Sequence, residues 1–305
     1  MPGWSLIRAR QGHQRALRLW RAGRPARAQS VMERAVARYR PGDERAAALG
    51  ALGEMQAARG RYRDAEETLR RAGAPVRLGD VQRRRGRYAE AERTLRAAVD
   101  SADARNALGV LLKDLGRYAE AATCYAAALA DAGDDRDLRA SIHHNLAGLA
   151  YAEGRLADAE APAREAVAVR EATRGPDATE VAADRAVLAT VLIGLRRHDE
   201  AERHVVAALD TWIRRHGPDH PEVAGCLNIL GVLRYRQGRV DEAVRVLRDA
   251  ERIRTTALGP EHPEVAVVRN NLAVALASDG PTVDGPAAAK IRRSANAARR
   301  RPSLG

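Results

Sequence analysis

Two histidines in matching sequence contexts are the first candidates for metal chemistry. His220 lies in the tripeptide DHP, and His262 lies in EHP, 42 residues further along the chain. The ligands of a metal site must converge on one point, whereas equivalent places in successive sequence repeats lie one repeat apart. Pro221 and Pro263 follow the histidines directly, and proline is typical of the first position of a helix. The pattern therefore predicts two helix starts and no metal site.

The cysteines Cys124 and Cys226 are the candidates for redox chemistry. A disulfide requires Cα atoms within about 7 Å of each other, whereas these two residues fall on predicted helices that several other helices separate. We expect two unpaired, buried thiols, which are typical of a reducing compartment. The sequence contains no GxSxG, P-loop, GxGxxG or CxxC pattern. We therefore expect no catalytic residue, no cofactor and no enzymatic activity.

The formal net charge of +12 raises the question of a nucleic-acid partner. Lys113 and Lys290 are the only lysines, and the abundance of arginine and alanine is typical of a GC-rich genome. Acidic residues are interleaved with the arginines, as in ERTLRAAVDSADAR, where they can form ion pairs along a helix. Local excess charge is expected in QRRRGR (82–87) and in the carboxyl-terminal segment. The pattern argues against nucleic acid as the main partner.

A hexapeptide that recurs along the chain indicates the elements that position these residues. GRYAEA occupies 86–91 and 116–121, and the variant GRYRDA occupies 60–65. In each copy an alanine follows the glycine after five and after twelve residues, and a small residue precedes it by seven. The same offsets recover further copies anchored on Gly23, Gly154, Arg196 and Gly238, with arginine in place of glycine at 196.

The spacing within each copy predicts a pair of antiparallel helices. Leu49, Leu52 and Met55 keep helical spacing up to Gly60, which can adopt the left-handed conformation that ends a helix. Small residues where the two helices cross allow their backbones to approach closely. One such hairpin cannot bury its apolar stripe alone, so neighbouring hairpins must stack. The sequence thus predicts an all-α solenoid.

These repeats resemble the tetratricopeptide repeat, which has Leu and a small residue before the turn, Tyr after it, Ala at two packing positions and a period of about 34 residues. The resemblance implies a right-handed superhelical solenoid of about eight stacked helix pairs. From Gly154 the period becomes 42 residues, with the joins RGPDATEV (174–181), HGPDHPEV (216–223) and LGPEHPEV (258–265). These joins, together with the tripeptide NLA, are similar to the kinesin light chain subtype.

The change of period divides the chain into three expected parts. Residues 1–153 hold irregular repeats, and a 26-residue step among them predicts a shortened first helix or loop. Residues 154–280 hold the 42-residue repeats, and residues 281–305 form a degenerate basic capping helix and tail. Within that last part, 286–300 is either a docked second helix of an eighth repeat or a disordered basic tail.

The resemblance also implies a binding groove, because the first helix of each tetratricopeptide repeat lines the concave face. The implied groove residues are Arg83, Arg84, Asn106, Lys113, His144, Asn145, Tyr151, Asn228, Tyr235, Arg236, Asn270 and Asn271. Asparagine amides can bind an extended peptide backbone, and asparagine is a mediocre helix former with no packing reason to recur there. A bare apolar patch is expected between these positions, formed by Ala186, Val187, Ile193 and Gly194.

We therefore expect a cytoplasmic, non-catalytic adaptor whose groove binds a peptide or a segment of a partner protein, with acidic character where arginine and lysine line the groove. No stretch of about 18 apolar residues occurs, so no membrane span is expected. Two alternatives stay open: nucleic-acid binding through Arg83–Arg85 and Arg299–Arg301, and a peptide-sensing regulator that acts through another chain. Self-association through the ends of the array is also open, particularly at the first repeat, where Arg15 replaces the usual Leu.

Overall fold

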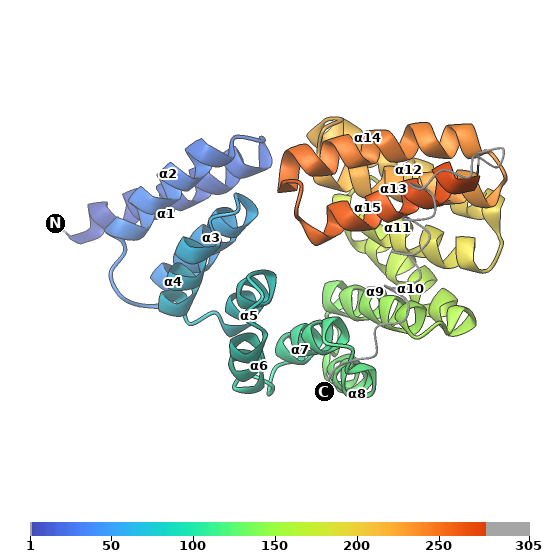
Figure 1. Cartoon of the computed structure of the whole chain (residues 1–305). Helices are drawn as coiled ribbons and strands as arrows, with labels where there is room; N and C mark the ends of the chain where they lie inside the picture. The colour runs from blue at the N-terminus through green and yellow to red at the C-terminus, as the bar shows by residue number, and fades with distance from the viewer. Residues whose placement is uncertain (1, 279–305) are drawn as a thin grey trace. The chain divides into compact units, whose positions relative to one another are not determined.

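The computed structural model describes residues 2–278, which form fifteen α-helices and no β-strand (Figure 1). The first helices of successive repeats are α1 (Pro2–Arg21), α3 (Asp43–Ala58), α5 (Pro75–Arg84), α7 (Ala102–Asp114), α9 (Arg136–Ala152), α11 (Thr179–Gly194), α13 (Pro221–Arg236) and α15 (Pro263–Ser278). The second helices are α2 (Pro25–Arg38), α4 (Tyr62–Ala72), α6 (Tyr88–Arg96), α8 (Tyr118–Asp131), α10 (Leu156–Arg174), α12 (His198–His216) and α14 (Val240–Leu258). The expected all-α array of helix pairs is confirmed.

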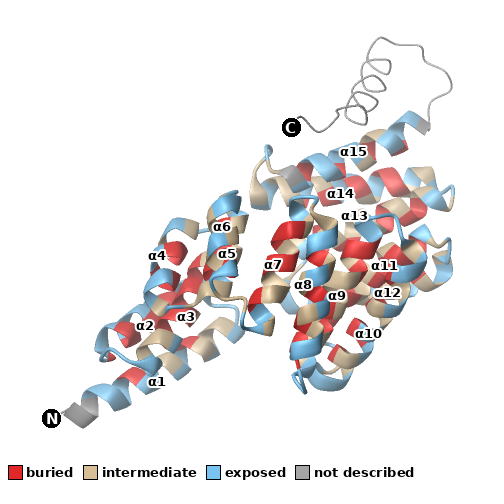
Figure 2. Ribbon diagram, turned by 90° about the horizontal axis from the view of Figure 1, so that it is seen from below, coloured by how far each residue is buried: buried red, intermediate tan, exposed pale blue. Residues whose placement is uncertain are grey.

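Residue contacts divide the chain into two compact bodies, an amino-terminal body of residues 1–149 and a carboxyl-terminal body that begins at Ala150, within α9. In each body a second helix packs against its own first helix and against the first helix of the next repeat, as α4 does with α3 and α5, and α12 with α11 and α13. Buried residues lie on the facing sides of these helices (Figure 2). The helix expected at 286–300 lies outside the described residues.

The turn between the two helices of a repeat depends on a left-handed residue at the anchor position. Gly60, Gly116 and Gly238 have φ values of 72°, 75° and 76°. Arg196, which replaces the anchor glycine, has φ 61° and is the single non-glycine residue with positive φ between residues 2 and 278. Its N–H donates to the Ile193 carbonyl at 3.1 Å, so the turn keeps its geometry despite the substitution. The anchor predicted from the sequence is confirmed.

The small residue seven positions before the anchor is required by packing inside each helix pair. A Cβ on Gly109 would lie 2.5 Å from the ring of Tyr125, which is fully buried on the facing second helix. A Cβ on Gly53 would lie 2.5 Å from the side chain of Leu69 in the same way. Real Cβ atoms do not approach other atoms so closely, so glycine at these positions lets a large side chain fill the crossing point.

Helix length follows the two sequence periods. The 26-residue step, from Gly60 to Gly86, contains the short first helix α5, which has ten residues, as expected. The second helix α6, after this step, is also short, with nine residues. In the 42-residue region, α10, α12 and α14 each have 19 residues and each ends at a glycine of positive φ, namely Gly175, Gly217 and Gly259. Within the described residues, no helix combines the length and the apolar character needed to cross a membrane.

Candidate functional site

Consecutive first helices contact one another within each body, as α5 does with α7 and α13 with α15. We call the surface that they form, on the side away from the second helices, the first-helix face of that body. All twelve residues implied by the resemblance lie on first helices. Arg83 and Arg84 lie on α5, Asn106 and Lys113 on α7, His144, Asn145 and Tyr151 on α9, Asn228, Tyr235 and Arg236 on α13, and Asn270 and Asn271 on α15.

Four of the asparagines form two hydrogen-bonded pairs, one in each body. The Asn145 Nδ2 group donates to Asn106 Oδ1 at 2.9 Å, which links α9 to α7. The Asn271 Nδ2 group donates to Asn228 Oδ1 at 2.9 Å, which links α15 to α13. The expectation that asparagine has no packing reason to recur here is therefore wrong, because the amides connect adjacent repeats. Asn270 is exposed beside the second pair.

Each amide pair retains unused hydrogen-bonding capacity. An asparagine side chain has two N–H donors and a carbonyl oxygen with two lone pairs. The pair uses one donor and one acceptor, whichever way each amide is turned, so one NH₂ group and one carbonyl oxygen remain for a ligand. All four side chains are half-buried, so their positions are held by the surrounding helices while they stay accessible.

The two groove arginines of α5 already have acidic partners. Arg83 donates to Asp80 at 2.8 Å and to Asp114 at 2.6 Å, and 24% of its side chain is exposed. Burial alone would lower the pKa of Arg83, but the two carboxylates outweigh it and raise that pKa. Arg84 donates to the same Asp80 at 2.7 Å. Both guanidinium charges are therefore already balanced by carboxylates of the chain itself.

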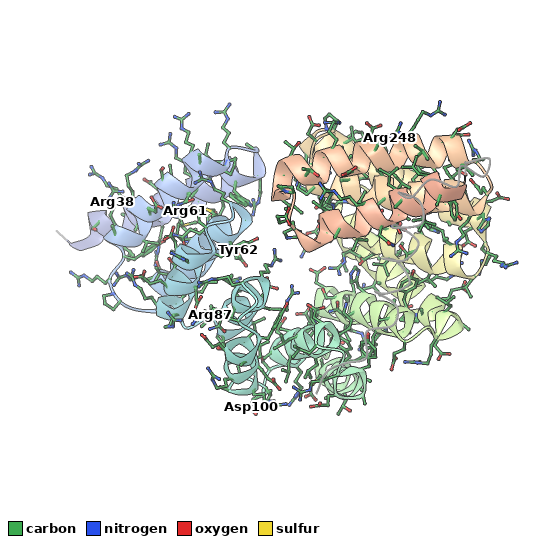
Figure 3. All side chains as sticks on the ribbon, in the orientation of Figure 1. Arg38, Arg61, Tyr62, Arg87, Asp100 and Arg248 are labelled. Carbon is green, nitrogen blue, oxygen red and sulfur yellow. The ribbon has the colours of Figure 1, made fainter. Side chains whose placement is uncertain are left out.

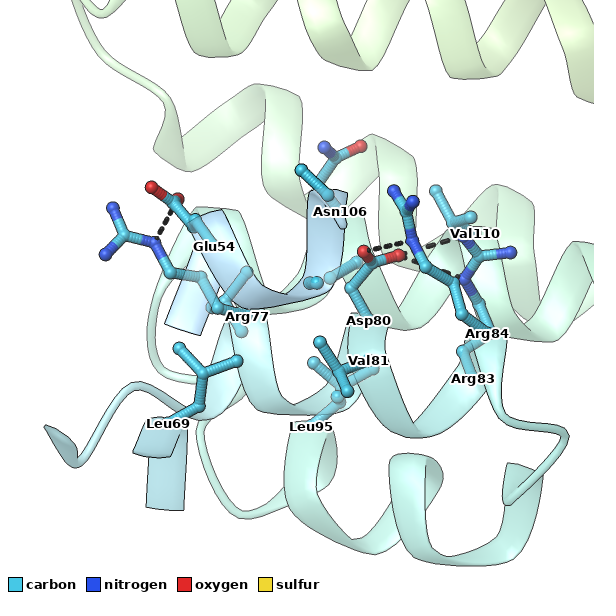
Figure 4. A pocket seen from close by; sticks show the side chains of 15 residues that line it. Glu54, Leu69, Arg77, Asp80, Val81, Arg83, Arg84, Leu95, Asn106 and Val110 are labelled. Atoms are coloured by element: carbon cyan, nitrogen blue, oxygen red, sulfur yellow. Dashed lines mark hydrogen bonds and ion pairs between the residues drawn. The ribbon is translucent and has the colours of Figure 1, made fainter. Parts of the chain in front are cut away.

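A pocket of about 420 Å³ opens on the first-helix face of the amino-terminal body, between α3, α5 and α7 (Figure 4). Its apolar lining includes Leu69, Val81 and Leu95, which are almost fully buried at its floor, and the half-buried Val76 and Val110. Asp80 and Asn106 supply polar groups at its edge, and Asn106 belongs to the first amide pair. A second ion pair on this lining joins Arg77 of α5 and Glu54 of α3, at 2.7 Å. The pocket therefore has an apolar interior and a rim whose charges are balanced.

The remaining implied groove residues differ in accessibility. Tyr151 is 44% exposed and Arg236 is exposed. Lys113 and His144 are half-buried. Tyr235 is also half-buried, because its ring packs against the core cluster that contains Leu247. Among the implied residues, the carboxyl-terminal body thus offers one open tyrosine ring, on α9, and one open guanidinium, on α13.

The bare apolar patch expected on α11 is wrong at Ile193. Ile193 is only 8% exposed and belongs to the core rather than to the surface. Gly194 is exposed, although a Cβ built on it would lie 2.9 Å from Leu156 of α10. Ala186 and Val187 are half-buried. The offset from the small residue gave the wrong face near the end of the helix.

His220 and His262 cap helices, a role that the sequence analysis assigned only to the prolines after them. The Nδ1 atom of His220 accepts a hydrogen bond from the Glu222 N–H at 3.2 Å, and His262 accepts from the Glu264 N–H at 3.2 Å. Burial and the nearby imidazole of His216 lower the pKa of His220, which favours the neutral ring that can accept this bond. Within residues 2–278, no group of three potential ligands could hold a metal ion.

Both cysteines are free, as expected. Cys226 is buried, and burial raises the pKa of its thiol to about 12. Cys124 is half-buried, and burial also raises the pKa of its thiol. Since the thiolate is the nucleophile, neither group is activated for covalent chemistry at neutral pH.

The arginine of the recurring hexapeptide makes ion pairs that the sequence analysis missed. Arg117 donates to Glu120 of its own repeat at 2.5 Å and to Glu92 of the preceding repeat at 2.7 Å. Arg87 (labelled in Figure 3) joins Glu90 and the buried Glu66 in the same way. The arginine therefore connects successive second helices. The acidic residue three positions after it was a visible signal, since this spacing places the two side chains on one helix face.

Comparison with known proteins identifies the architecture. Tetratricopeptide repeat profiles match residues 13–75, 76–97, 100–172 and 180–256. BtubC (BKLC) from P. vanneervenii is similar over 87% of this chain and 97% of that one, with 25% identity and a TM-score of 0.50.

Two further solved structures are similar to this chain. A putative kinesin light chain from Podosopora anserina, with nearly identical TPR-like repeats, is 20% identical over 65% of this chain and 96% of that one, with a TM-score of 0.48. A chain of the APC/C hetero-tetramer Cut9–Hcn1 is 15% identical over 86% of this chain and 48% of that one, with a TM-score of 0.62. A search of curated proteins gives no match.

Proposed function

Because the chain belongs to the tetratricopeptide repeat family, we propose that it is a non-catalytic adaptor that holds an extended segment of a partner protein on its first-helix faces. Arrays of this family serve as protein-interaction scaffolds. The observation that carries the proposal is that two amide pairs, Asn106 with Asn145 and Asn228 with Asn271, lie on these faces.

An extended peptide matches what an amide pair leaves unused. Each residue of such a peptide carries one N–H donor and one C=O acceptor on its main chain. An amide pair presents a remaining NH₂ group to the carbonyl and a remaining carbonyl oxygen to the N–H. This recognition is independent of the partner's side chains, so it supplies affinity along the face while neighbouring groups supply selectivity.

The two bodies favour different side chains of the partner protein. In the amino-terminal body the apolar pocket beside Asn106 suits an aliphatic or aromatic side chain. The existing ion pairs of Arg83 and Arg84 argue against an acidic preference there. In the carboxyl-terminal body the exposed Arg236 and Tyr151 suit an acidic or mixed segment.

Selection from a displayed random-peptide library tests the proposal. Peptides are selected on the wild-type chain and then measured against a variant with Asn145→Ala and Asn271→Ala, one change in each pair. We expect roughly a tenfold loss of affinity, since a hydrogen bond to a buried or half-buried polar group contributes about 1–1.5 kcal/mol. Circular dichroism checks that the helices of the variant remain intact.

A matched control separates the first-helix face from the rest of the surface. Arg93→Ala and Arg203→Ala change exposed residues on the second helices α6 and α12 and should leave affinity unchanged. Each backbone nitrogen of a selected peptide is methylated in turn. We expect methylation at one or two of these positions to abolish binding, because it removes the N–H that an amide oxygen accepts. Equal binding of selected peptides to the asparagine variant and the wild type contradicts the proposal.

A further inference from the structure

The positive charge of this protein is concentrated in its first helix pair. Residues 1–40 contain ten arginines and a single acidic residue, Glu33. Residues 41–278 contain 36 arginines and lysines against 37 aspartates and glutamates. The array after the first repeat is therefore neutral, although the whole chain has a net charge of +12. The excess of arginine in QRRRGR is balanced by carboxylates outside that run, at Asp80 and Glu66.

Ion pairing follows the same division. In the QRRRGR run, Arg83 and Arg84 pair with Asp80, and Arg85 and Arg87 pair with Glu66. In the first pair of helices, one arginine has an acidic partner within the described residues, since Arg10 pairs with Glu44 of α3. Between residues 2 and 278, no carboxylate forms an ion pair with the other arginines of α1 and α2.

The unpaired arginines form two stripes on the solvent side of these helices. On α1 the stripe consists of Arg8, Arg15 and Arg18, spaced by seven and three residues. On α2 it consists of Arg27, Arg34 and Arg38, spaced by seven and four. Spacings of three, four and seven place side chains on one helix face. All six side chains are exposed, and long side chains extend from both helices in Figure 3, where Arg38 is labelled.

Part of this surface is hollowed. A depression of about 360 Å³ is lined by Arg15, Arg18 and Arg24, together with Leu19 and Ala22. It therefore brings guanidinium groups from α1 and from the start of α2 around one space. Guanidinium groups match phosphate oxygens with two parallel hydrogen bonds, so such a hollow suits a phosphate group.

We propose that the arginine surface of α1 and α2 binds the phosphate backbone of a nucleic acid. A nucleic acid presents closely and regularly spaced negative charges, about one per 1.7 Å of duplex axis, which suit exposed arginines that recur along two helices in contact. Tyr39 is buried and Trp20 is half-buried, so neither offers an open ring on which a base could stack. Binding therefore occurs through phosphates and is independent of base sequence.

An anionic membrane fits this surface less well. Interfacial helices bury an apolar face among the lipids, whereas the apolar face of α1 is used inside the protein, where Ala9 and Ala16 are buried and Leu19 packs on the core. Leu6 and Ile7, at 38% and 49% exposed, are the large apolar side chains that the described part of α1 leaves open. Two such residues at one end of the helix give little area for insertion.

Salt-dependent binding measured by fluorescence anisotropy tests the proposal. The full chain is titrated into a labelled DNA duplex and into a labelled single strand of unrelated sequence, at 50 and 200 mM NaCl. Six phosphate contacts predict that the association constant for duplex falls about 2,000-fold between these salt concentrations. In a variant with Arg15→Gln, Arg18→Gln and Arg34→Gln, the fall should be about 40-fold, because three contacts remain.

The control variant carries Arg203→Gln, Arg245→Gln and Arg248→Gln, which removes the same charge from exposed arginines on α12 and α14. It should keep the salt dependence of the wild type. An equal loss in this control shows that net charge alone acts and overturns the proposal. Failure to bind either nucleic acid at 50 mM NaCl also overturns the proposal. This holds equally if the chain binds anionic lipid vesicles, or polyglutamate, under the same conditions.

Discussion

Replacement of Arg196 by glycine should stabilise the sixth repeat, because it restores the residue that the turn requires. Arg196 has φ 61°, the left-handed conformation that glycine adopts in the other anchor turns between repeats one and seven. Its side chain is exposed and forms no ion pair in the described structure, so the substitution removes no favourable contact. The effect of Arg196→Gly on stability therefore depends on the backbone.

The expected gain is the difference between two backbone effects. A non-glycine residue in the left-handed region costs about 1–2 kcal/mol. Glycine loses more conformational freedom when the chain folds, which costs about 0.5–1 kcal/mol relative to alanine. Arg196→Gly should therefore raise the free energy of unfolding by about 0.5–1 kcal/mol. For a cooperative unit of this size, the melting temperature should rise by about 1–3 °C.

The matched experiment makes the opposite change in another repeat. A Cβ on Gly116 would have no atom within 4 Å, so Gly116→Arg changes the backbone preference without a clash and should cost about the amount that Arg196→Gly gains. Because repeat arrays can unfold repeat by repeat, thermal unfolding alone can miss a local effect. Hydrogen exchange of the backbone amides in α11 and α12 should therefore be measured as well. If Arg196→Gly leaves hydrogen exchange unchanged and Gly116→Arg leaves the free energy of unfolding unchanged, the left-handed conformation does not explain the preference for glycine at the anchor position.

Two further predictions concern packing and electrostatics. Gly109→Ala should destabilise the fourth repeat by about 1–3 kcal/mol in urea unfolding, because the new Cβ would lie 2.5 Å from the buried ring of Tyr125. Gly148→Ala, where the nearest atom is a lysine nitrogen at 3.6 Å, should be neutral or stabilising, and equal effects at both glycines would refute the packing argument. Glu202 has its pKa held at about 2, chiefly by the hydrogen bond from Arg234 and against the opposing effect of burial. A lowered folded-state pKa gives stability that is present above about pH 4.5 and is lost as the pH falls towards 2. With a third of the side chain exposed, the contribution is about 1–2 kcal/mol. In the Glu202→Gln variant, the free energy of unfolding should depend less on pH in that range. An unchanged pH dependence would show that this ion pair does not contribute to stability.

The sequence predicts the repeat architecture well because its determinants lie within single repeats. The anchor at Arg196 and the small residue at Gly109 each act on a turn or a facing helix less than twenty residues away. Such contacts recur with the period of the sequence, so repetition itself exposes them. The same argument explains why the short α5 followed from the 26-residue step.

The site was less predictable because its contacts join different repeats. Asn145 bonds to Asn106 over 39 positions, and Arg83 bonds to Asp114 over 31. No single repeat contains both partners, so position alone placed these residues on the first helices but did not show which were paired. The concentration of arginine in residues 1–40 can be counted in the sequence. Only the structure shows that most of these arginines have no acidic partner among the described residues.

The central claim is that a partner segment lies on the first-helix face beside the amide pairs. The most direct measurement is photo-crosslinking with a selected peptide that carries a photoreactive group, followed by mass spectrometry of the linked residues. The account predicts links to α7 and α9 around Asn106 and Asn145, or to α13 and α15 around Asn228 and Asn271. Links confined to the second helices α4, α6, α8, α10, α12 or α14 would contradict it.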